Sequence, residues 1–277
     1  MQKTLFRFIK QVASLAQKHC AAGLVAISNP TGNGFAGWKH VVLHYLRIEM
    51  VKSYAETVDY ASEMDRIRRF LNLPMFGFPK PSTLCRSFHR TPMAVLRRLL
   101  AGSAELLNQS GHAAVDSTFL TRERAPPHYL RRIDRSVETF KVTFLVDTAD
   151  HAIIDVGCST RWPNDAKIGP KLARRNIEAL RSLSADKGYD SNSFRTELRD
   201  GGVRPLIKHR IYSSLDHAHN TRIDSDSYNR RWMAESVFAS IKRTLGATVR
   251  ACSWWLEFRE TLLKATVYNL RRGVRYP

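Results

Sequence analysis

The stretch D-S-D-S-Y-N-R-R-W-M-A-E-S-V-F-A-S-I-K-R-T-L, residues 224–245, decides the fold of this chain. No Gly or Pro interrupts it, and the Asp and Ser residues at its start are favourable helix N-caps, so it predicts one helix of about 18 residues from Tyr228 onward. A rotation of about 100° per residue brings four polar side chains within about 60° of one another: Tyr228, Arg231, Glu235 and Lys242. The sequence therefore predicts a polar stripe along one side of this helix.

An apolar seam lies well away from the polar stripe on the same helix. Met233, Val237 and Ile241 recur at four-residue spacing and can dock the helix on a core. A polar stripe on such a helix is most often only a solvated face. Two further carboxylates, at positions where strands would present them to this helix, favour a functional site over that simpler explanation.

The charge balance of the chain points to a polyanionic partner. The 277 residues include 44 Lys and Arg against 25 Asp and Glu, a net charge of +19, and the basic excess is spread along the chain. A basic excess of this kind is typical of proteins that bind nucleic acid and less so of proteins on membrane surfaces. On charge alone, a ribosomal or membrane-surface protein stays open.

Other classes of protein are disfavoured by composition. The sequence has no uncharged apolar run of the length that spans a membrane, and its start lacks the apolar core of a signal peptide. The four cysteines are far apart and form no C-x-x-C pair. We therefore expect reduced thiols, no membrane partner and a cytoplasmic location.

Residues 1–110 are expected to be all helical. Apolar residues recur there at helical spacing, and Thr91-Pro92 resembles an N-cap followed by a first-turn proline. Arg86 and Arg90 are candidate contacts to a DNA backbone. The alternative is a helical dimerisation or lid domain whose arginines are only exposed.

The pattern changes to strands after Gly111. We expect a meander of three strands followed by a helix, a strand, a helix, a strand and a polar connection: residues 112–120, 139–146, 152–159, 169–182, 183–186, 191–199, 203–208 and 209–226. Asp116 lies inside the first strand, and Asp186 ends the fourth. A buried Asp is costly unless it is paired with a cation, and a salt bridge to an arginine is the structural alternative to a metal.

Asp116, Asp186 and Glu235 thus come from two strands and a late helix. Three converging carboxylates in a basic protein suit Mg²⁺ or Mn²⁺, which prefer oxygen ligands. Two such ions about 3.5 to 4 Å apart can stabilise the attacking and leaving oxygens of a phosphodiester displacement. The acids therefore predict metal-dependent chemistry on nucleic acid.

The same residues resemble the DDE transposases of insertion sequences, in the family-four and family-five group. That family carries its third acid in a signature of Tyr, two residues, Arg, three residues, Glu, six residues and Lys, which Tyr228, Arg231, Glu235 and Lys242 match without a gap. The segments A-V-D-S-T around Asp116 and A-D-K-G-Y-D around Asp186 resemble those of the first and second aspartates. The resemblance covers about residues 110 to 272.

The resemblance implies an α/β fold of the RNase H-like, retroviral-integrase-like type, with a mixed five-stranded sheet flanked by helices. The catalytic domain would span residues 111–277, and helical residues 1–110 would bind DNA ends or dimerise. Two Mg²⁺ or Mn²⁺ ions would be held by the three acids of the family: Asp116, Asp186 and Glu235. Phosphates of the transposon end would be positioned by the rest of the signature: Tyr228, Arg231 and Lys242. Trp162 is expected to stack on an unpaired base, with ordinary packing as the alternative.

The expected function is that of a transposase, which cuts at terminal inverted repeats and joins 3′-hydroxyl ends to target DNA. Its partners would be the double-stranded DNA of the repeats and of the target, and a second copy of the chain. A prokaryotic nucleoid would be its location. Two alternatives stay open: an RNase H-like nuclease or resolvase without strand transfer, and a catalytically silent DNA-binding protein derived from a transposase.

Overall fold

The structure, a computed structural model, describes residues 4–19, 37–122, 139–159 and 167–275. Contacts divide the chain into two compact units, and each is described here by itself. The first comprises Met1–Leu106 and Leu262–Pro277, and the second comprises Leu107–Thr261. No helix in the described part of the chain is both long and apolar enough to cross a membrane.

The described part of the first unit is entirely helical, as the sequence predicts. It contains α1 (Thr4–His19), α2 (Gly37–Met50), α3 (Tyr54–Glu63), α4 (Asp65–Leu71), α5 (Pro81–Arg90), α6 (Met93–Ala104) and the later turns of α13 (Trp254–Arg275). Helix α3 begins at a capping box, in which Ser53 and Glu56 bond to each other's backbone N–H groups. Arg86 and Arg90 are exposed on α5.

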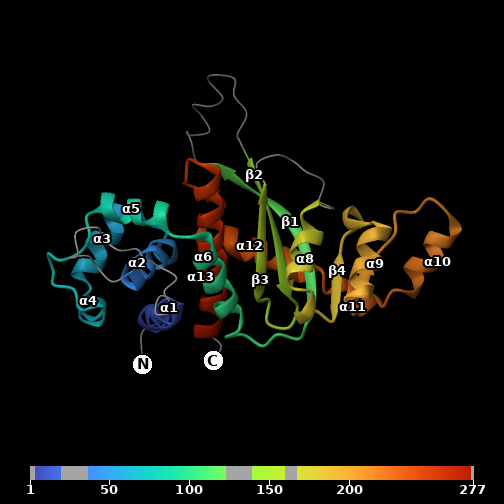
Figure 1. Cartoon of the computed structure of the whole chain (residues 1–277), viewed down its shortest axis with the longest axis horizontal. Coiled ribbons are helices and arrows are strands. Elements are labelled where there is room, and N and C mark those ends of the chain that lie inside the picture. The colour runs from blue at the N-terminus through green and yellow to red at the C-terminus, as the bar shows by residue number, and fades with distance from the viewer. Residues whose placement is uncertain (1–3, 20–36, 123–138, 160–166, 276–277) are drawn as a thin grey trace, which may run out of the picture. The chain divides into compact units, whose positions relative to one another are not determined.

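The second unit is built on a mixed sheet (Figure 1). Its strands are β1 (His112–Arg122), β2 (Thr139–Asp147), β3 (Ile153–Ser159), β4 (Ser182–Ala185), β5 (Arg204–Ile207) and the two-residue β6 (Thr248–Val249). The order is β3-β2-β1-β4-β5, with β6 beside β1. Strands β1, β2 and β3 are antiparallel, and β4 and β5 run parallel to β1. The expected antiparallel meander and five-stranded mixed sheet are confirmed, and β6 is an addition.

Helices cover both faces of this sheet. On one face, Val115 and Leu145 join a buried cluster with residues of α8 (Gly169–Arg175) and α9 (Asn192–Asp200). On the other face, the ring of Phe144 stacks on that of Phe238 in α12 (Trp232–Leu245), with 4.7 Å between centroids. Because successive side chains of a strand point to opposite faces, residues in phase with Phe144 point toward α12.

The helix predicted from Tyr228 to Leu245 is in fact two helices. Short α11 (Ser225–Asn229) precedes α12, and two turn residues separate them. The N–H of Arg231 bonds to the carbonyl of Tyr228, three residues back, which tightens the chain at this junction. The prediction of one uninterrupted helix was wrong, although the polar stripe survives the break.

Two other predicted boundaries differ from the structure. The helix expected over residues 169–182 stops at Arg175, where the side chain of Asn176 donates to the carbonyl of Leu172 and to the carboxylate of Asp155. The connection 209–226 contains α10 (Ser214–Arg222), which begins at a capping box formed by Ser213 and Asp216.

The buried carboxylate of Asp147, at the end of β2, fixes the start of β1. It accepts hydrogen bonds from the backbone N–H groups of Ser110 and Gly111, each at 2.9 Å, and from that of Ala149 at 2.8 Å. The carbonyl of Gly111 in turn accepts from the N–H of Arg181, immediately before β4, at 2.7 Å. Asp147 therefore secures the point from which β1 and β4 run side by side.

Replacing Asp147 with Ala should lower the free energy of unfolding by about 3 kcal/mol, because it removes charge-assisted bonds and leaves buried N–H groups without acceptors. Chemical denaturation measures this. Asp150→Ala is the matched control in the same turn, since Asp150 accepts a single exposed bond, from the N–H of Asn108. Equal losses in the two variants would contradict the role given to Asp147.

Candidate active site

Asp116 and Asp186 lie on neighbouring parallel strands at the same level. The last paired residues of β1 and β4 are Val115 and Ala185, so each aspartate is the next residue on its strand. Asp186 still has an extended backbone, with φ −70° and ψ 165°. Adjacent strands lie about 4.8 Å apart, so the register brings the two carboxylates together.

Both aspartates face the helix pair α11 and α12. Asp116 is paired across the sheet with Phe144, whose ring contacts α12, and cross-strand partners share a face. Ser184, two residues before Asp186, donates from its hydroxyl to the carbonyl of Ser227 in α11 at 3.2 Å. Alternation along each strand therefore directs both carboxylates toward the helix that carries Glu235.

Arg231 is the cation that these acids share. Its guanidinium donates to the Glu235 carboxylate at 2.8 Å, and the side chains are 25% and 54% exposed. Burial would lower the pKa of Arg231, but the charges of Glu235, Asp116 and Asp186 and the Tyr228 side chain raise it above its usual value. All three acids thus lie within electrostatic reach of one arginine.

Tyr228 forms the buried wall of this site. Its side chain packs under the ammonium of Lys208, which lies 4.3 Å from the ring centroid. Burial raises the pKa of Tyr228, and the charge of Asp186 raises it further, while the charge of Arg231 lowers it. The phenol therefore stays protonated and can donate a hydrogen bond at neutral pH.

Lys242 bridges α12 and β1. Its ammonium donates to the hydroxyl of Thr118 at 2.7 Å, and Thr118 lies two residues beyond Asp116 on the same face of β1. All four residues of the polar stripe are thus on the side of the helices that faces the aspartates. On the apolar side, Val237 and Ile241 are buried as predicted, and Met233 is half-buried.

The arrangement does not by itself form a ready metal site. In the described part of the chain, no three or more His, Cys, Asp or Glu side chains are grouped so that they could hold an ion. Asp116 and Asp186 supply a pair of hard oxygen donors, whereas Glu235 is engaged by Arg231. A three-carboxylate site would require Glu235 to leave that arginine.

The other three predicted DNA contacts come from other parts of the chain. Trp162 is outside the described residues. Arg86 and Arg90 belong to the first unit, on the exposed side of α5.

Sequence reasoning missed two residues that border the site: Thr118 and Lys208. The register of β4 and β5 pairs Ala185 with Ile207, so Lys208 stands next to Asp186 as Asp116 does on the other side. The sequence signal for Lys208 was its position immediately after a predicted strand, at the edge where the acids gather.

The chain matches a known protein family and is similar to a solved structure. Residues 108–270, more than half of the chain, match the family described as the transposase DDE domain. Among solved structures, the chain is similar to the piggyBac transposase in a cryo-EM synaptic complex with hairpin DNA, with a TM-score of 0.50 and 10% identity. That match covers 98% of this chain and 74% of the other, and it supports the RNase H-like transposase fold. No curated protein matches the chain.

The bond between Lys242 and Thr118 should contribute about 1 kcal/mol to stability, because it is a single half-buried hydrogen bond to a charged group. A double-mutant cycle of Thr118→Val and Lys242→Met measures the coupling. Arg243→Met, on the exposed side of α12, replaces Lys242→Met in the control cycle. Additive effects of Thr118→Val and Lys242→Met would show that the bond does not hold α12 to β1.

Proposed function

The chain belongs to the transposase DDE domain family, and on that premise we propose that it is a transposase that moves its own DNA element. It would cut DNA at the terminal inverted repeats and join the freed 3′-hydroxyl ends to target DNA. Both reactions replace one oxygen at a phosphorus with another, so one site can perform them in turn.

The observation that carries this proposal is the position of the three acids. Asp116 and Asp186 are level on adjacent strands, and both face the helix that carries Glu235. The four residues of the signature lie on that side as well. The carboxylates therefore lie beside the two cations and the protonated phenol of the signature. This combination suits a phosphodiester substrate held next to a divalent metal.

The residues that would hold the metals are Asp116, Asp186 and Glu235. Bound Mg²⁺ or Mn²⁺ would activate the attacking oxygen and stabilise the leaving one. The donors fit such ions, because all are carboxylate oxygens and the aspartates are neighbours in register. Arg231 compensates the charge of these acids, and Glu235 would complete the ligand set once its carboxylate is released from Arg231.

The remaining signature residues would position the DNA. Arg231, released from Glu235, would take a phosphate oxygen through charge-assisted bonds, and Lys242 would do the same from the β1 side. Tyr228 would donate its phenolic proton to a phosphate oxygen, since its raised pKa keeps the phenol neutral. These contacts neutralise a strand that the carboxylates would otherwise repel.

The helical region of residues 1–110 would recognise the ends or join two copies. Its exposed arginines on α5 suit phosphate contacts. An element has two ends, so the working complex would contain at least two copies of the chain. We propose residues 1–110 for this role and residues 111–277 for catalysis.

The test is an assay with labelled duplex DNA that carries the sequences flanking the gene. We expect nicking at the repeat ends and joining to target DNA in Mg²⁺ or Mn²⁺, and neither in EDTA. Asp116→Asn, Asp186→Asn and Glu235→Gln should each lower the rate by more than about 100-fold, because each removes a metal ligand. Glu178→Gln, an exposed acid before β4 at the opposite end of that strand, should keep the wild-type rate.

The outcomes separate the candidate functions. Cutting without joining would favour a nuclease or resolvase. Binding without cutting by the wild type would contradict an active enzyme and leave a silent DNA-binding protein. Full activity in any of the three acid variants would overturn the assignment of that residue.

A further inference from the structure

A second set of basic residues borders Asp186, outside the four-residue signature. Lys187 follows Asp186 directly, and Lys208 and Arg210 begin the segment 208–213, which we call the β5 loop. Strands β4 and β5 are parallel, so the segments that follow them leave the sheet at the same edge. The ammonium of Lys208 packs on the ring of Tyr228. Lys187 and Arg210 are therefore the two residues of this set that can serve an external ligand.

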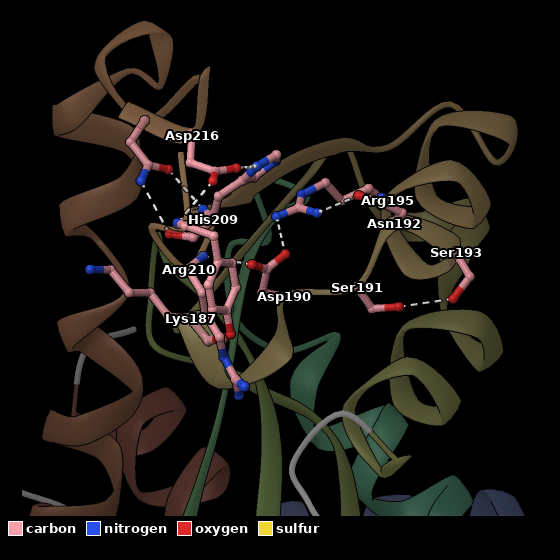
Figure 2. A network of polar contacts seen from close by, with 11 residues as sticks. Lys187, Asp190, Ser191, Asn192, Ser193, Arg195, His209, Arg210 and Asp216 are labelled. Carbon is pink, nitrogen blue, oxygen red and sulfur yellow. Dashed lines mark hydrogen bonds and ion pairs between the residues drawn. The ribbon is translucent and has the colours of Figure 1, made fainter. Parts of the chain in front are cut away.

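Asp190 ties the segment after β4 to the β5 loop (Figure 2). One carboxylate oxygen accepts the backbone N–H of Arg210 at 2.6 Å, and the other accepts the guanidinium of Arg195. The Arg195 side chain is only 3% exposed and that of Asp190 16%, so this pair is an internal support. The guanidinium of Arg210 also donates through Nε to the carbonyl of Lys187 at 3.3 Å.

The backbone of the β5 loop is held from its other side by α10. The carboxylate of Asp216 accepts from the N–H groups of Tyr212 and Ser213 at 3.0 and 2.9 Å, and from the ring of His209. The side chain of Asn220 bonds to both the N–H and the carbonyl of His209. Side chains thus hold the backbone of the loop at four of its six residues, although it belongs to no strand or helix.

The two segments held in this way carry two exposed cations. The side chains of Lys187 and Arg210 are exposed, and among the described residues no carboxylate forms an ion pair with either. Among the residues that the structure describes, the guanidinium of Arg210 bonds through Nε only, so its terminal N–H groups can serve another partner. Two residues further on, Tyr212 is 83% exposed, and its backbone N–H is held by Asp216. Two exposed cations and an exposed aromatic ring on neighbouring segments suit a nucleic-acid strand better than a small anion.

We propose that Lys187 and Arg210 both contact the backbone of a DNA strand beside Asp186, and we call these two residues the clamp. Asp190 is its positioning residue, since it fixes the two segments to each other. The clamp holds the DNA strand on the β5 side of Asp186, whereas Asp116 lies on the β1 side. Residues that follow both neighbouring β-strands therefore contact the DNA around the reacting phosphate. This proposal rests on the function proposed above, because it requires DNA at the acids.

Fluorescence anisotropy tests the clamp with the full chain and a duplex DNA of the gene's flanking sequence, in EDTA and over a range of NaCl concentrations. Arg210→Ala and Lys187→Ala should each weaken binding roughly 5- to 10-fold at 0.1 M salt and reduce the slope of log affinity against log salt by about 1. Arg181→Ala is the matched control, an exposed arginine at the opposite end of β4. It should leave affinity and slope near wild type.

Asp190→Ala separates positioning from charge. It makes the protein more positive by one charge, so a general electrostatic attraction would tighten binding, whereas loss of the clamp weakens it and lowers the salt slope. Thermal melting shows whether this variant folds. If it does not fold, the comparison of Arg210→Ala with Arg181→Ala decides alone.

Three results would overturn the clamp. Equal effects of Arg210→Ala and Arg181→Ala would overturn it while the proposed transposase stands. Inorganic phosphate that raises the melting temperature of wild type but not of Arg210→Ala, with DNA affinity unchanged in that variant, would assign the pair to free phosphate. Absence of DNA binding by the wild type would overturn both the clamp and the proposed function.

Discussion

The buried carboxylate of Asp147 is the constraint on which the site depends. By binding the N–H groups of Ser110 and Gly111, it fixes where β1 begins. The carbonyl of Gly111 accepts the N–H of Arg181, and this bond aligns the start of β4 with the start of β1. The register of β1 and β4 follows, and with it the level position of Asp116 and Asp186. A slip of one residue would turn Asp116 to the opposite face, toward α8 and away from the helix of Glu235.

The site is also a balance of charges that would otherwise repel one another. Three carboxylates share Arg231, whose pKa is raised above its usual value although burial opposes this. The ion pair of Arg231 with Glu235 offsets part of this repulsion, and it engages the Glu235 carboxylate away from the other two acids. Binding of metal and DNA would then be coupled, because Glu235 would be needed to hold the ion and Arg231 would be released to contact a phosphate.

Much of this arrangement could be predicted from the sequence, for physical reasons. The strands show the alternation of apolar residues, and the four signature residues have the spacing of one helical face, so the fold and the facing of α12 follow from local patterns. Three features depend on contacts between distant residues. The role of Asp147 requires Ser110, which is 37 residues away. Lys208 and Thr118 border the site only because of strand register and helix placement.

Local chemistry also misled the sequence interpretation. Helix α10 has no buried residues, so it lacks an apolar stripe, and its capping box inside a polar segment was the only signal. The helix from Tyr228 was predicted to be continuous because it contains no Gly or Pro. The chain instead tightens at Arg231, whose N–H bonds to the carbonyl of Tyr228, and the ring of Tyr228 packs against Lys208.

Under the proposed function, strand register brings Asp116 and Asp186 together to hold a divalent metal. A crystal of the full chain grown with Mn²⁺, with diffraction recorded at the manganese absorption edge, tests it most directly. We expect an anomalous peak within bonding distance of carboxylate oxygens from both Asp116 and Asp186. Manganese bound elsewhere, with no peak between these two side chains in a preparation that cuts DNA in Mn²⁺, would contradict it.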